Sequence, residues 1–589
     1  MEFADLRARA ERWIADDPDP VTQKELRALL GQPDLGATDL ADRFAGSLEF
    51  GTAGLRGVVG AGPNRMNRAV VARATWGLAQ DLLASVPGAR ERGVVVGGDA
   101  RTMSRELSED TAAILAAAGL RVVLFRQPVP TPLVGFSVKR LGAAAGVVVT
   151  ASHNPPEYNG YKVYWENAAQ IVPPVDARIA AAIERAPAAA RVERPDLREL
   201  VARGLVVDAS AGLEQDYIDA ILALAVHPSE GDRSLVVVYT PMHGVGDLLA
   251  RRALAAARFT DVTSVPEQQK PDPAFPTVKF PNPEEPGAMD LSFALAKTLG
   301  AALVLANDPD ADRLAAAIPA PGGGFRQLTG NELGVALGHY LLTERPVTRP
   351  RAVLASIVSS PLLGRIAADL GVRYEETLTG FKWIANRSIE LERDGFEVVF
   401  GFEEALGYCV GGVVRDKDGI SAALLAAELG AVLRARGRTI ADALDDIARR
   451  WGVFTSSQVN VTRKGASGIA ALRSMMGALR AAPPLRVADD EVVAVSDYEA
   501  GARVDARTGA RTPLTLPRSN VLTFELASGS RIIARPSGTE PKAKFYFDVR
   551  EAVAPGEPVA AAAARATAAM KLLSGSFSKT CRAAAGESD

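Results

Sequence analysis

Short apolar runs rich in β-branched residues alternate with helical segments along the first third of the chain. A strand-like run, Val94–Val96, is followed by a helical stretch over 105–118 and by a second strand-like run, Val122–Phe125. This order is typical of a β-α-β unit. The fully apolar run Ala145–Val149 extends the unit as a buried strand. The pattern therefore predicts an α/β domain with a mostly parallel sheet.

The same alternation recurs twice before the pattern changes. A second α/β unit is predicted from the strands Leu235–Tyr239, Val262–Val265 and Ala302–Ala306, and a third from the strands Val353–Val358, Val372–Glu375 and Glu397–Phe400. The last part of the chain has scattered strands, among them Arg531–Ala534 and Lys544–Val549, before an alanine-rich closing helix. That mixture is typical of an α+β domain.

Five segments follow from these patterns, because a chain of 589 residues is too long for one core. Residues 1–45 are predicted to be a helical extension, with Thr22 and Glu25 spaced as a capping box. The other four segments are predicted to be domain 1 at 46–210, domain 2 at 211–326, domain 3 at 327–450 and domain 4 at 451–589.

Composition narrows the class of protein. Hydrophobic residues make up 48% and charged residues 23% of the chain, as in soluble globular proteins. The 67 Lys and Arg nearly balance the 70 Asp and Glu, and no basic run indicates nucleic acid binding. Neither a secretion signal nor a membrane-spanning run is visible. Because the two cysteines, Cys409 and Cys581, are far apart, we expect a reduced, cytoplasmic protein.

One polar loop stands at the carboxyl end of the buried run Ala145–Val149. It reads Thr-Ala-Ser-His-Asn-Pro-Pro-Glu-Tyr-Asn-Gly-Tyr-Lys over 150–162 and places Ser152 where open α/β sheets carry their ligand chemistry. Asn154-Pro155 and Asn159-Gly160 favour tight turns on both sides. Ser152 is thus a candidate nucleophile, with a simple turn residue as the alternative.

Three aspartates follow the second unit's last strand. Asp308, Asp310 and Asp312 alternate with other residues, so an extended backbone would bring their side chains to one face. Three carboxylates on one face suit Mg²⁺. An EF-hand calcium loop is excluded, because its glycine and glutamate positions hold Arg313 and Pro319. A solvated acidic turn is the alternative.

Three more loops carry polar groups suited to sugar phosphates. Arg535-Pro536-Ser537-Gly538-Thr539 offers a guanidinium, hydroxyls and backbone amides for a phosphate, without the spacing of a nucleotide-binding loop. Glu403 and Glu404 could accept hydrogen bonds from sugar hydroxyls. Arg56 lies in a glycine-rich loop, 49–57, that would let an anion approach the backbone.

Four of these loops resemble, in the same order, the signature loops of the α-D-phosphohexomutase superfamily. They are the segments Thr150–Lys162, Asp308–Arg313, Glu403–Glu404 and Arg535–Lys542. Phe50–Gly57 and Phe402–Tyr408 look most like its phosphoglucomutase-2 branch, which includes phosphopentomutases. The resemblance covers about residues 45–575. It implies three similar α/β mixed-sheet domains and a C-terminal α+β domain around a central cleft.

The resemblance also implies a role for each loop. Ser152 would carry the phosphoryl group, and Asp308, Asp310 and Asp312 would bind one Mg²⁺ that also contacts the seryl phosphate. Glu403 and Glu404 would read the sugar hydroxyls. The unreacting phosphate would be held by Arg535, Ser537, Gly538 and Thr539, with Arg56 and Lys542 as further substrate contacts. Lys162 and Lys417 match positions linked to proton transfer or charge stabilisation, Arg313 belongs to the same catalytic set, and His153 is an alternative base.

A Mg²⁺-dependent mutase that works through a sugar bisphosphate intermediate is therefore expected. We favour 1- and 6-phosphates of glucose or mannose, with 1- and 5-phosphates of ribose or deoxyribose as the alternative. Ala405 stands where many hexose mutases have a serine, which leaves the sugar open. Two rival classes are a serine hydrolase using Ser152 with His153, although adjacent residues of a strand point apart, and a silent sugar-phosphate binder. The expected partners are small sugar phosphates, and the protein would be a monomer or homodimer.

Overall fold

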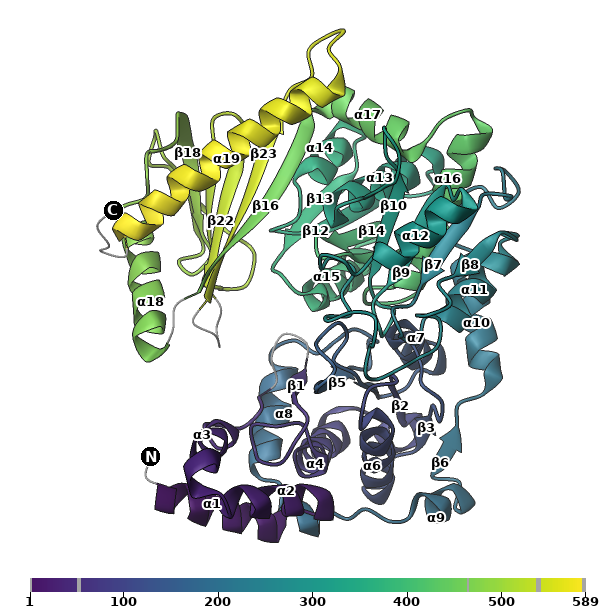
Figure 1. The fold of residues 1–589 in the computed structure, drawn as a ribbon, viewed down its shortest axis with the longest axis vertical. Coiled ribbons are helices and arrows are strands. Elements are labelled where there is room, and N and C mark those ends of the chain that lie inside the picture. Colours follow the sequence, from purple (N-terminus) through teal and green to yellow (C-terminus); the bar gives the residue numbers. More distant parts are fainter. Residues whose placement is uncertain (1–2, 50–53, 463–464, 537–541, 585–589) are drawn as a thin grey trace. The chain divides into compact units, whose positions relative to one another are not determined.

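A computed structural model describes residues 3–49, 54–462, 465–536 and 542–584 of the chain (Figure 1). The chain divides into two compact units. The first combines Met1–Ala352 with Gly380–Gly437, and the second combines Val353–Thr379 with Arg438–Asp589.

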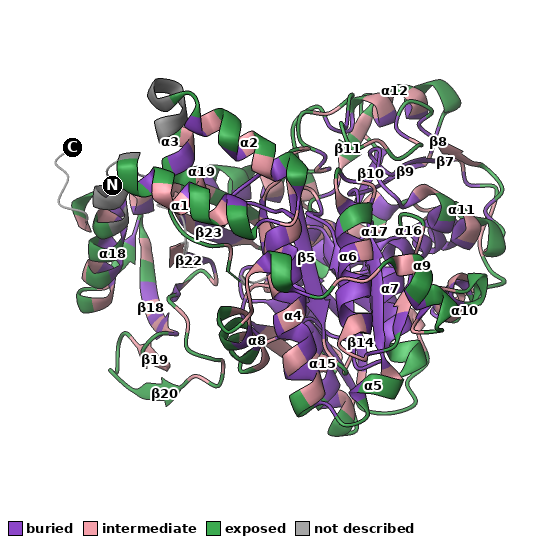
Figure 2. Ribbon diagram, turned by 90° about the horizontal axis from the view of Figure 1, so that it is seen from below, coloured by how far each residue is buried: buried purple, intermediate pink, exposed green. Residues whose placement is uncertain are grey.

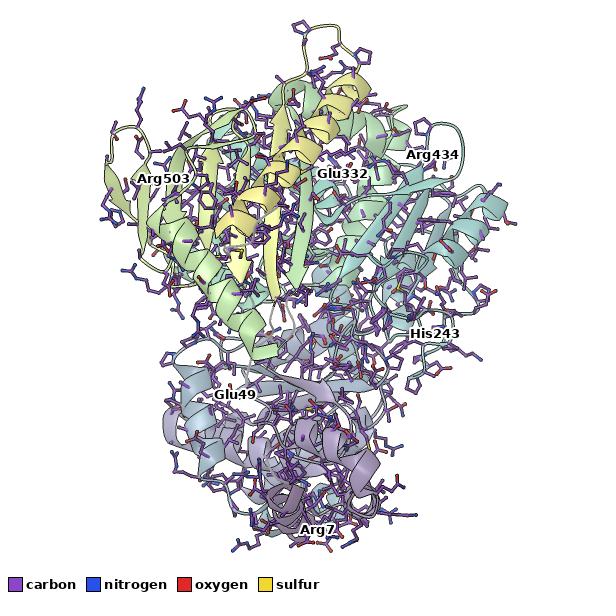
Figure 3. The ribbon with its side chains drawn as sticks, turned by 60° about the vertical axis from the view of Figure 1, so that its left-hand side comes forward. Arg7, Glu49, His243, Glu332, Arg434 and Arg503 are labelled. Atoms are coloured by element: carbon purple, nitrogen blue, oxygen red, sulfur yellow. The ribbon has the colours of Figure 1, made fainter. Side chains whose placement is uncertain are left out.

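The amino-terminal extension is helical, as the sequence predicts. It consists of α1 (Phe3–Asp16), α2 (Pro20–Leu30) and α3 (Pro33–Arg43). Their apolar faces form a small core that includes Leu6, Ala10, Leu26, Leu40 and Phe44. Arg7 lies on the exposed side of α1 (Figure 3).

The predicted capping box at Thr22 and Glu25 is wrong. Helix α2 begins earlier, because Pro20 occupies its first turn and Asp19 caps it by accepting a hydrogen bond from Val21 N at 2.9 Å. Thr22 therefore lies inside the helix, and its hydroxyl donates to Asp17 Oδ2 at 2.7 Å. Thr22 and Glu25 have the spacing of a capping box, but Asp19 and Pro20 just before them are the stronger signal for the start of the helix.

Domain 1 is built on a six-stranded mixed sheet in the order β1-β5-β4-β2-β3-β6. The strands are β1 (Leu55–Val58), β2 (Val94–Gly98), β3 (Val122–Leu124), β4 (Ala145–Val149), β5 (Tyr158–Tyr164) and β6 (Val206–Asp208). Strands β4, β2, β3 and β6 run parallel, while β5 pairs antiparallel with both β1 and β4.

Helices cover both faces of this sheet and so bury its strands. They are α4 (Arg68–Ser85), α5 (Ala89–Arg92), α6 (Ser104–Ala117), α7 (Thr131–Leu141), α8 (Val175–Glu184) and α9 (Leu197–Ala202). The chain crosses from β2 to β3 through α6 and returns past β2 to β4 through α7, so right-handed connections place these two helices on opposite faces. Every residue of β4 is buried, as its apolar sequence predicts, and β5 is buried over most of its length (Figure 2).

Domain 2 repeats the layout with five strands in the order β11-β10-β9-β7-β8. They are β7 (Val237–Thr240), β8 (Val262–Ser264), β9 (Leu303–Asn307), β10 (Leu314–Pro319) and β11 (Phe325–Gln327), accompanied by α10 (Ala211–Leu222), α11 (Asp247–Ala256) and α12 (Asp290–Leu299). Strand β9 lies parallel to β7 and antiparallel to β10. The turn from β9 to β10 is the predicted aspartate loop.

Domain 3 contributes to both compact units. In the first unit lie α13 (Gly330–Glu344), α15 (Phe381–Arg393), α16 (Gly419–Ala435) and the antiparallel pair β14 (Glu397–Glu403) and β15 (Gly407–Val410). Helix α13 starts with a capping box, in which Thr329 Oγ1 accepts from the backbone N–H of Glu332, the residue marked in Figure 3, and the Glu332 carboxylate accepts from Thr329 N. Strand β12 (Arg351–Ser356) lies largely in the second unit, which also holds α14 (Leu362–Asp369) and β13 (Arg373–Thr377).

The rest of the second unit is an antiparallel sheet in the order β16-β23-β22-β21-β18-β19-β20. Its strands are β16 (Val453–Thr462), β17 (Arg486–Val487), β18 (Asp490–Asp497), β19 (Ala502–Asp505), β20 (Arg511–Pro513), β21 (Leu522–Leu526), β22 (Arg531–Pro536) and β23 (Lys542–Glu551), with helices α17 (Ile440–Trp451), α18 (Gly465–Ala481) and α19 (Val559–Ala584). Helix α19 runs across the strands (Figure 1). It buries Phe577 against the rings of Phe524, Phe545 and Phe547.

Arg531 ties the start of β22 to the domain 3 segment of the same unit. Its Nη1 lies 2.9 Å from Glu376 Oε1 on β13, its Nε lies 2.7 Å from Asp548 Oδ2, and it also donates to Ser359 O. The predicted fold class is confirmed: three α/β mixed-sheet domains precede a C-terminal domain with an antiparallel sheet. Among the described residues, no helix is both long and apolar enough to cross a membrane.

Candidate active site

Ser152 sits in a tight loop between β4 and β5, where the sequence predicts it. Its backbone is left-handed, with φ +52°, and only 2% of the residue is exposed. The Ser152 N–H donates to Thr150 Oγ1 at 2.8 Å, which holds the turn closed. Because few residues other than glycine adopt this conformation without cost, the surrounding structure must hold it in place.

The hydroxyl of Ser152 points at the aspartate loop of domain 2. Its Oγ donates to Asp308 Oδ2 at 2.7 Å and lies 3.1 Å from Nδ1 of His153. The expectation that the side chains of Ser152 and His153 point apart is wrong, because the left-handed turn at Ser152 replaces the extended backbone on which it depended.

The three aspartates form one buried carboxylate cluster. Asp308, Asp310 and Asp312 are at most 1% exposed, and one oxygen from each lies within 4.8 Å of the others. They do not share a face of an extended strand. The backbone instead makes a tight turn, with Ala311 at φ +56° and its N–H donating to Asp308 O.

This cluster fits a divalent cation. Asp310 Oδ1 and Asp312 Oδ1 are buried and have no hydrogen-bond partner among the described residues. Burial and the two neighbouring carboxylates raise the pKa of Asp308 well above its usual range. The cluster has more carboxylate oxygens than hydrogen-bond donors to satisfy them. Such hard oxygen ligands are the ones that Mg²⁺ binds.

Two lysines face the same carboxylates. Lys162 Nζ donates to Asp310 Oδ2 at 2.7 Å and to Asp312 Oδ2 at 2.9 Å, and Lys417 Nζ lies 3.2 Å from Asp312 Oδ2. Burial alone would lower their pKa values, but the facing carboxylates raise the pKa of both ammonium groups. Although burial works against it, the Lys162 ammonium lowers the pKa of Asp310. Both lysines are therefore positively charged at neutral pH.

His153 differs from the lysines in its charge. Burial, and then the guanidinium groups of Arg313 and Arg56, lower the pKa of His153 well below its ordinary value. Its imidazole is therefore neutral and can accept a proton. Arg56 lies on β1 rather than in a loop, and its Nη1 donates to Asn154 Oδ1 at 2.8 Å. The backbone N–H of Arg313 donates to Asp308 Oδ1 at 3.0 Å.

The predicted sugar loop lies at the turn between β14 and β15. Glu403 is half-buried, and its Oε1 accepts a hydrogen bond from Gly380 N at 2.6 Å. Burial and the neighbouring Glu404 raise the pKa of Glu403 to about 7. Arg313 forms a backbone bridge with Gly407, so the aspartate loop and the sugar loop are joined.

The predicted phosphate loop lies in the second unit. Arg535 and Lys542 are half-buried at the facing ends of β22 and β23, which pair antiparallel. Ser537, Gly538 and Thr539 lie outside the described residues.

Two contacts of the site were missed at the sequence level. Thr131, the first residue of α7, donates from Oγ1 to Asp310 Oδ2 at 2.6 Å. Arg101 binds the backbone of the Ser152 loop. The available signal was weak: Arg101 follows β2, whose carboxyl end lies beside that of β4 in the sheet.

Comparisons with known proteins agree with this arrangement. Residues 47–190, 215–322 and 329–450 match the alpha/beta/alpha domains I, II and III of phosphoglucomutase/phosphomannomutase. A probable phosphoribomutase from Schizosaccharomyces pombe is 38% identical over 92% of this chain and 94% of its own length. A probable phosphomannomutase from Haemophilus influenzae is 41% identical over 82% of this chain and 93% of its own. A crystal structure of a putative phosphomannomutase from Thermus thermophilus has the same fold, with a TM-score of 0.65 at 23% identity over 91% of this chain and 99% of its own.

Proposed function

The chain belongs to the phosphoglucomutase/phosphomannomutase family of intramolecular phosphotransferases, and on this basis we propose that it moves a phosphoryl group between two hydroxyls of one sugar phosphate through Ser152. The observation that carries the proposal is the position of Ser152 Oγ, 2.7 Å from Asp308 Oδ2 at the edge of the carboxylate cluster. A hydroxyl beside three acidic groups can carry a phosphate only where a cation balances the charge.

We infer that Asp308, Asp310, Asp312 and Ser152 Oγ hold one Mg²⁺. The unpartnered oxygens of Asp310 and Asp312 support this set. When bound, the ion supplies the positive charge that the oxygens of the transferred phosphoryl group require. Lys162 and Lys417 add two fixed charges on the same side of the cluster.

The proton has a separate route in this proposal. When a sugar hydroxyl attacks the seryl phosphate, a P–O bond forms to the sugar and the bond to Ser152 Oγ breaks. In that step the sugar hydroxyl loses its proton and the departing Ser152 Oγ takes one up. In the reverse step Ser152 Oγ attacks a sugar phosphate, and the neutral His153 ring, 3.1 Å from that Oγ, is placed to accept the proton that Ser152 loses. Lys162 and Lys417 are protonated and serve as charge stabilisers, which supports His153 over them as the base.

For the sugar, we propose pentose 1- and 5-phosphates as the first candidate. The similarity to the probable phosphoribomutase extends over nearly the whole chain, whereas the probable phosphomannomutase aligns with less of it. Hexose 1- and 6-phosphates, expected from the signature loops, are the second candidate. They are supported by the higher identity to the probable phosphomannomutase. In either case Glu403 and Glu404 bind sugar hydroxyls, and a sugar bisphosphate is the intermediate that turns around between half-reactions.

The test combines mass and kinetics. Intact-protein mass after incubation with a sugar bisphosphate should show one added phosphoryl group, and Ser152→Ala should lose both this group and turnover. Steady-state rates on ribose 1-phosphate, glucose 1-phosphate and mannose 1-phosphate then rank the sugars. Undiminished turnover by Ser152→Ala refutes the mechanism, while a preference for either hexose overturns only the choice of sugar.

A further inference from the structure

The guanidinium of Arg101 is enclosed by the backbone of the Ser152 loop. Its Nη1 donates to Pro155 O at 2.8 Å and Tyr158 O at 3.2 Å, and its Nη2 donates to Ser152 O at 2.6 Å and Asn154 O at 2.5 Å. Arg101 is 3% exposed. One side chain therefore binds four carbonyl groups within a single seven-residue loop.

Asp99 holds the other side of the same arrangement. Its Oδ2 accepts from Thr150 Oγ1 at 2.6 Å and lies 3.4 Å from Arg101 Nε, while its Oδ1 accepts from Arg101 N at 3.0 Å. Thr150 Oγ1 in turn accepts from Ser152 N. The Asp99–Arg101 pair therefore binds the loop both before and after Ser152.

A ring from domain 2 completes the enclosure. The Phe275 ring centroid lies 4.9 Å from the Arg101 guanidinium carbon, within the range of a cation–π contact. Phe275 is 3% exposed. The guanidinium therefore lies between the Ser152 loop and a hydrophobic side chain of the next domain.

These contacts exclude a direct role for Arg101 in binding the substrate. Both terminal nitrogens donate to the four loop carbonyls, and Nε faces Asp99, so the group presents no open face to a phosphate. Its positive charge therefore stabilises backbone carbonyls of the loop. What it holds is the left-handed turn at Ser152, which costs free energy unless the surroundings fix it.

We propose that Arg101 is a positioning residue that fixes the backbone of the Ser152 loop so that Ser152 Oγ reaches the aspartate cluster. The inference rests on the proposed function of Ser152 as phosphate carrier. Only a planar guanidinium can bind four carbonyls arranged around it, because a lysine ammonium is a point charge with three donors. A misplacement of about 1 Å at the reacting atom costs roughly a hundredfold in rate.

The test is the single-turnover phosphorylation of Ser152 by glucose 1,6-bisphosphate, followed by intact-protein mass in the presence of Mg²⁺. The amplitude reports the fraction of molecules that are folded and competent, whereas the rate constant reports how well the loop is placed. We expect Arg101→Lys to keep the amplitude of the wild type and to lower the rate constant roughly 10- to 100-fold. Arg68→Lys is the matched control, since Arg68 also pairs with a buried carboxylate of domain 1, that of Asp110.

A second variant covers the case in which Arg101→Lys does not fold. Phe275→Leu keeps every carbonyl bond and removes only the ring over the guanidinium, and we expect a rate constant roughly threefold lower. A rate constant within about twofold of the wild type in the folded Arg101→Lys protein, or in Phe275→Leu if Arg101→Lys does not fold, overturns the inference, as does an equal fall in Arg68→Lys. Ser152→Ala separates the two proposals: if it still gains a phosphoryl group, the proposed function itself fails, whatever the Arg101 variant does.

Discussion

Lys417 Nζ lies 3.2 Å from Asp312 Oδ2, so a lysine from the loop before α16 faces the carboxylate that Lys162 of domain 1 already contacts at 2.9 Å. Residues from three domains therefore meet at Asp312. The two ammonium groups neutralise part of the charge of the buried aspartate cluster. Both the stability of the first unit and its response to Mg²⁺ should depend on this balance.

Lys162→Met should destabilise the first unit by about 3–5 kcal/mol, because it leaves the buried Asp310 carboxylate without an ammonium partner and Asp312 with that of Lys417 alone. The loss is measured as a lower melting temperature in EDTA. Mg²⁺ should restore part of it and should raise the melting temperature of the variant by more than that of the wild type. Lys297→Met, which changes an exposed lysine of domain 2, is the control. A melting temperature equal to that of the wild type would contradict the role of Lys162.

Asp310→Asn should remove the response to Mg²⁺. For the wild type, an ion that binds only the folded state at a hundredfold excess over its dissociation constant adds about 2.7 kcal/mol. The variant removes one ligand charge, so titration with Mg²⁺ should leave its melting temperature nearly constant. Asp261→Asn, an exposed position of the same domain, should respond like the wild type. An unchanged Mg²⁺ response in Asp310→Asn would mean that the ion binds elsewhere.

Glu403→Gln should remove a pH dependence of stability. The folded-state pKa of Glu403, about 7, lies above the ordinary value of 4.5, so the stability it contributes is fully present below pH 4.5 and is lost as the pH rises through 7. For a half-buried carboxylate the loss is on the order of 2 kcal/mol. Glutamine does not titrate and still accepts from Gly380 N.

The measurement for Glu403 is the melting temperature at about pH 5 and about pH 8. The variant should gain on the wild type at the higher pH, whereas the exposed Glu267→Gln should not. A difference that stays the same at both pH values would show that Glu403 is already ionised throughout.

Phe577→Ala should destabilise the second unit by about 3–5 kcal/mol, because it removes a fully buried ring that touches three other phenylalanines. Calorimetry should show this loss in one transition only. Leu572→Ala lies on the same helix at a position that is 67% exposed and should change little. If both variants lower all transitions equally, the two units do not unfold separately.

Much of the fold could be predicted from the sequence, because several central strands of the α/β domains, such as β4 and β9, are short, largely apolar runs. The run Ala145–Val149 is an example: helices cover both of its faces, so nearly every residue had to be apolar. Ser152 could be placed at the end of that strand for the same reason. That it meets Asp308 followed from the resemblance of the loops and not from any local pattern.

Long-range contacts and left-handed turns account for the errors and omissions at the site. Thr131 contacts Asp310, and Arg101 contacts four carbonyls of the Ser152 loop. These partners lie far along the chain, and no periodicity records such pairs. The aspartates do cluster, but through a left-handed turn at Ala311 that an alternating pattern does not reveal. The same kind of turn at Ser152 brings its hydroxyl to the His153 ring, against the expectation for a strand.

The second unit contains Val353–Thr379 as well as everything after Gly437, and this affects how the enzyme can be divided. A recombinant fragment that stops at residue 450 would retain Glu376 but lose Arg531, its ion-pair partner 2.9 Å away. It would thus leave both Glu376 and Ser359 O without the guanidinium that binds them. Dissection of this enzyme into separately expressed pieces therefore requires cuts that follow spatial grouping rather than chain order.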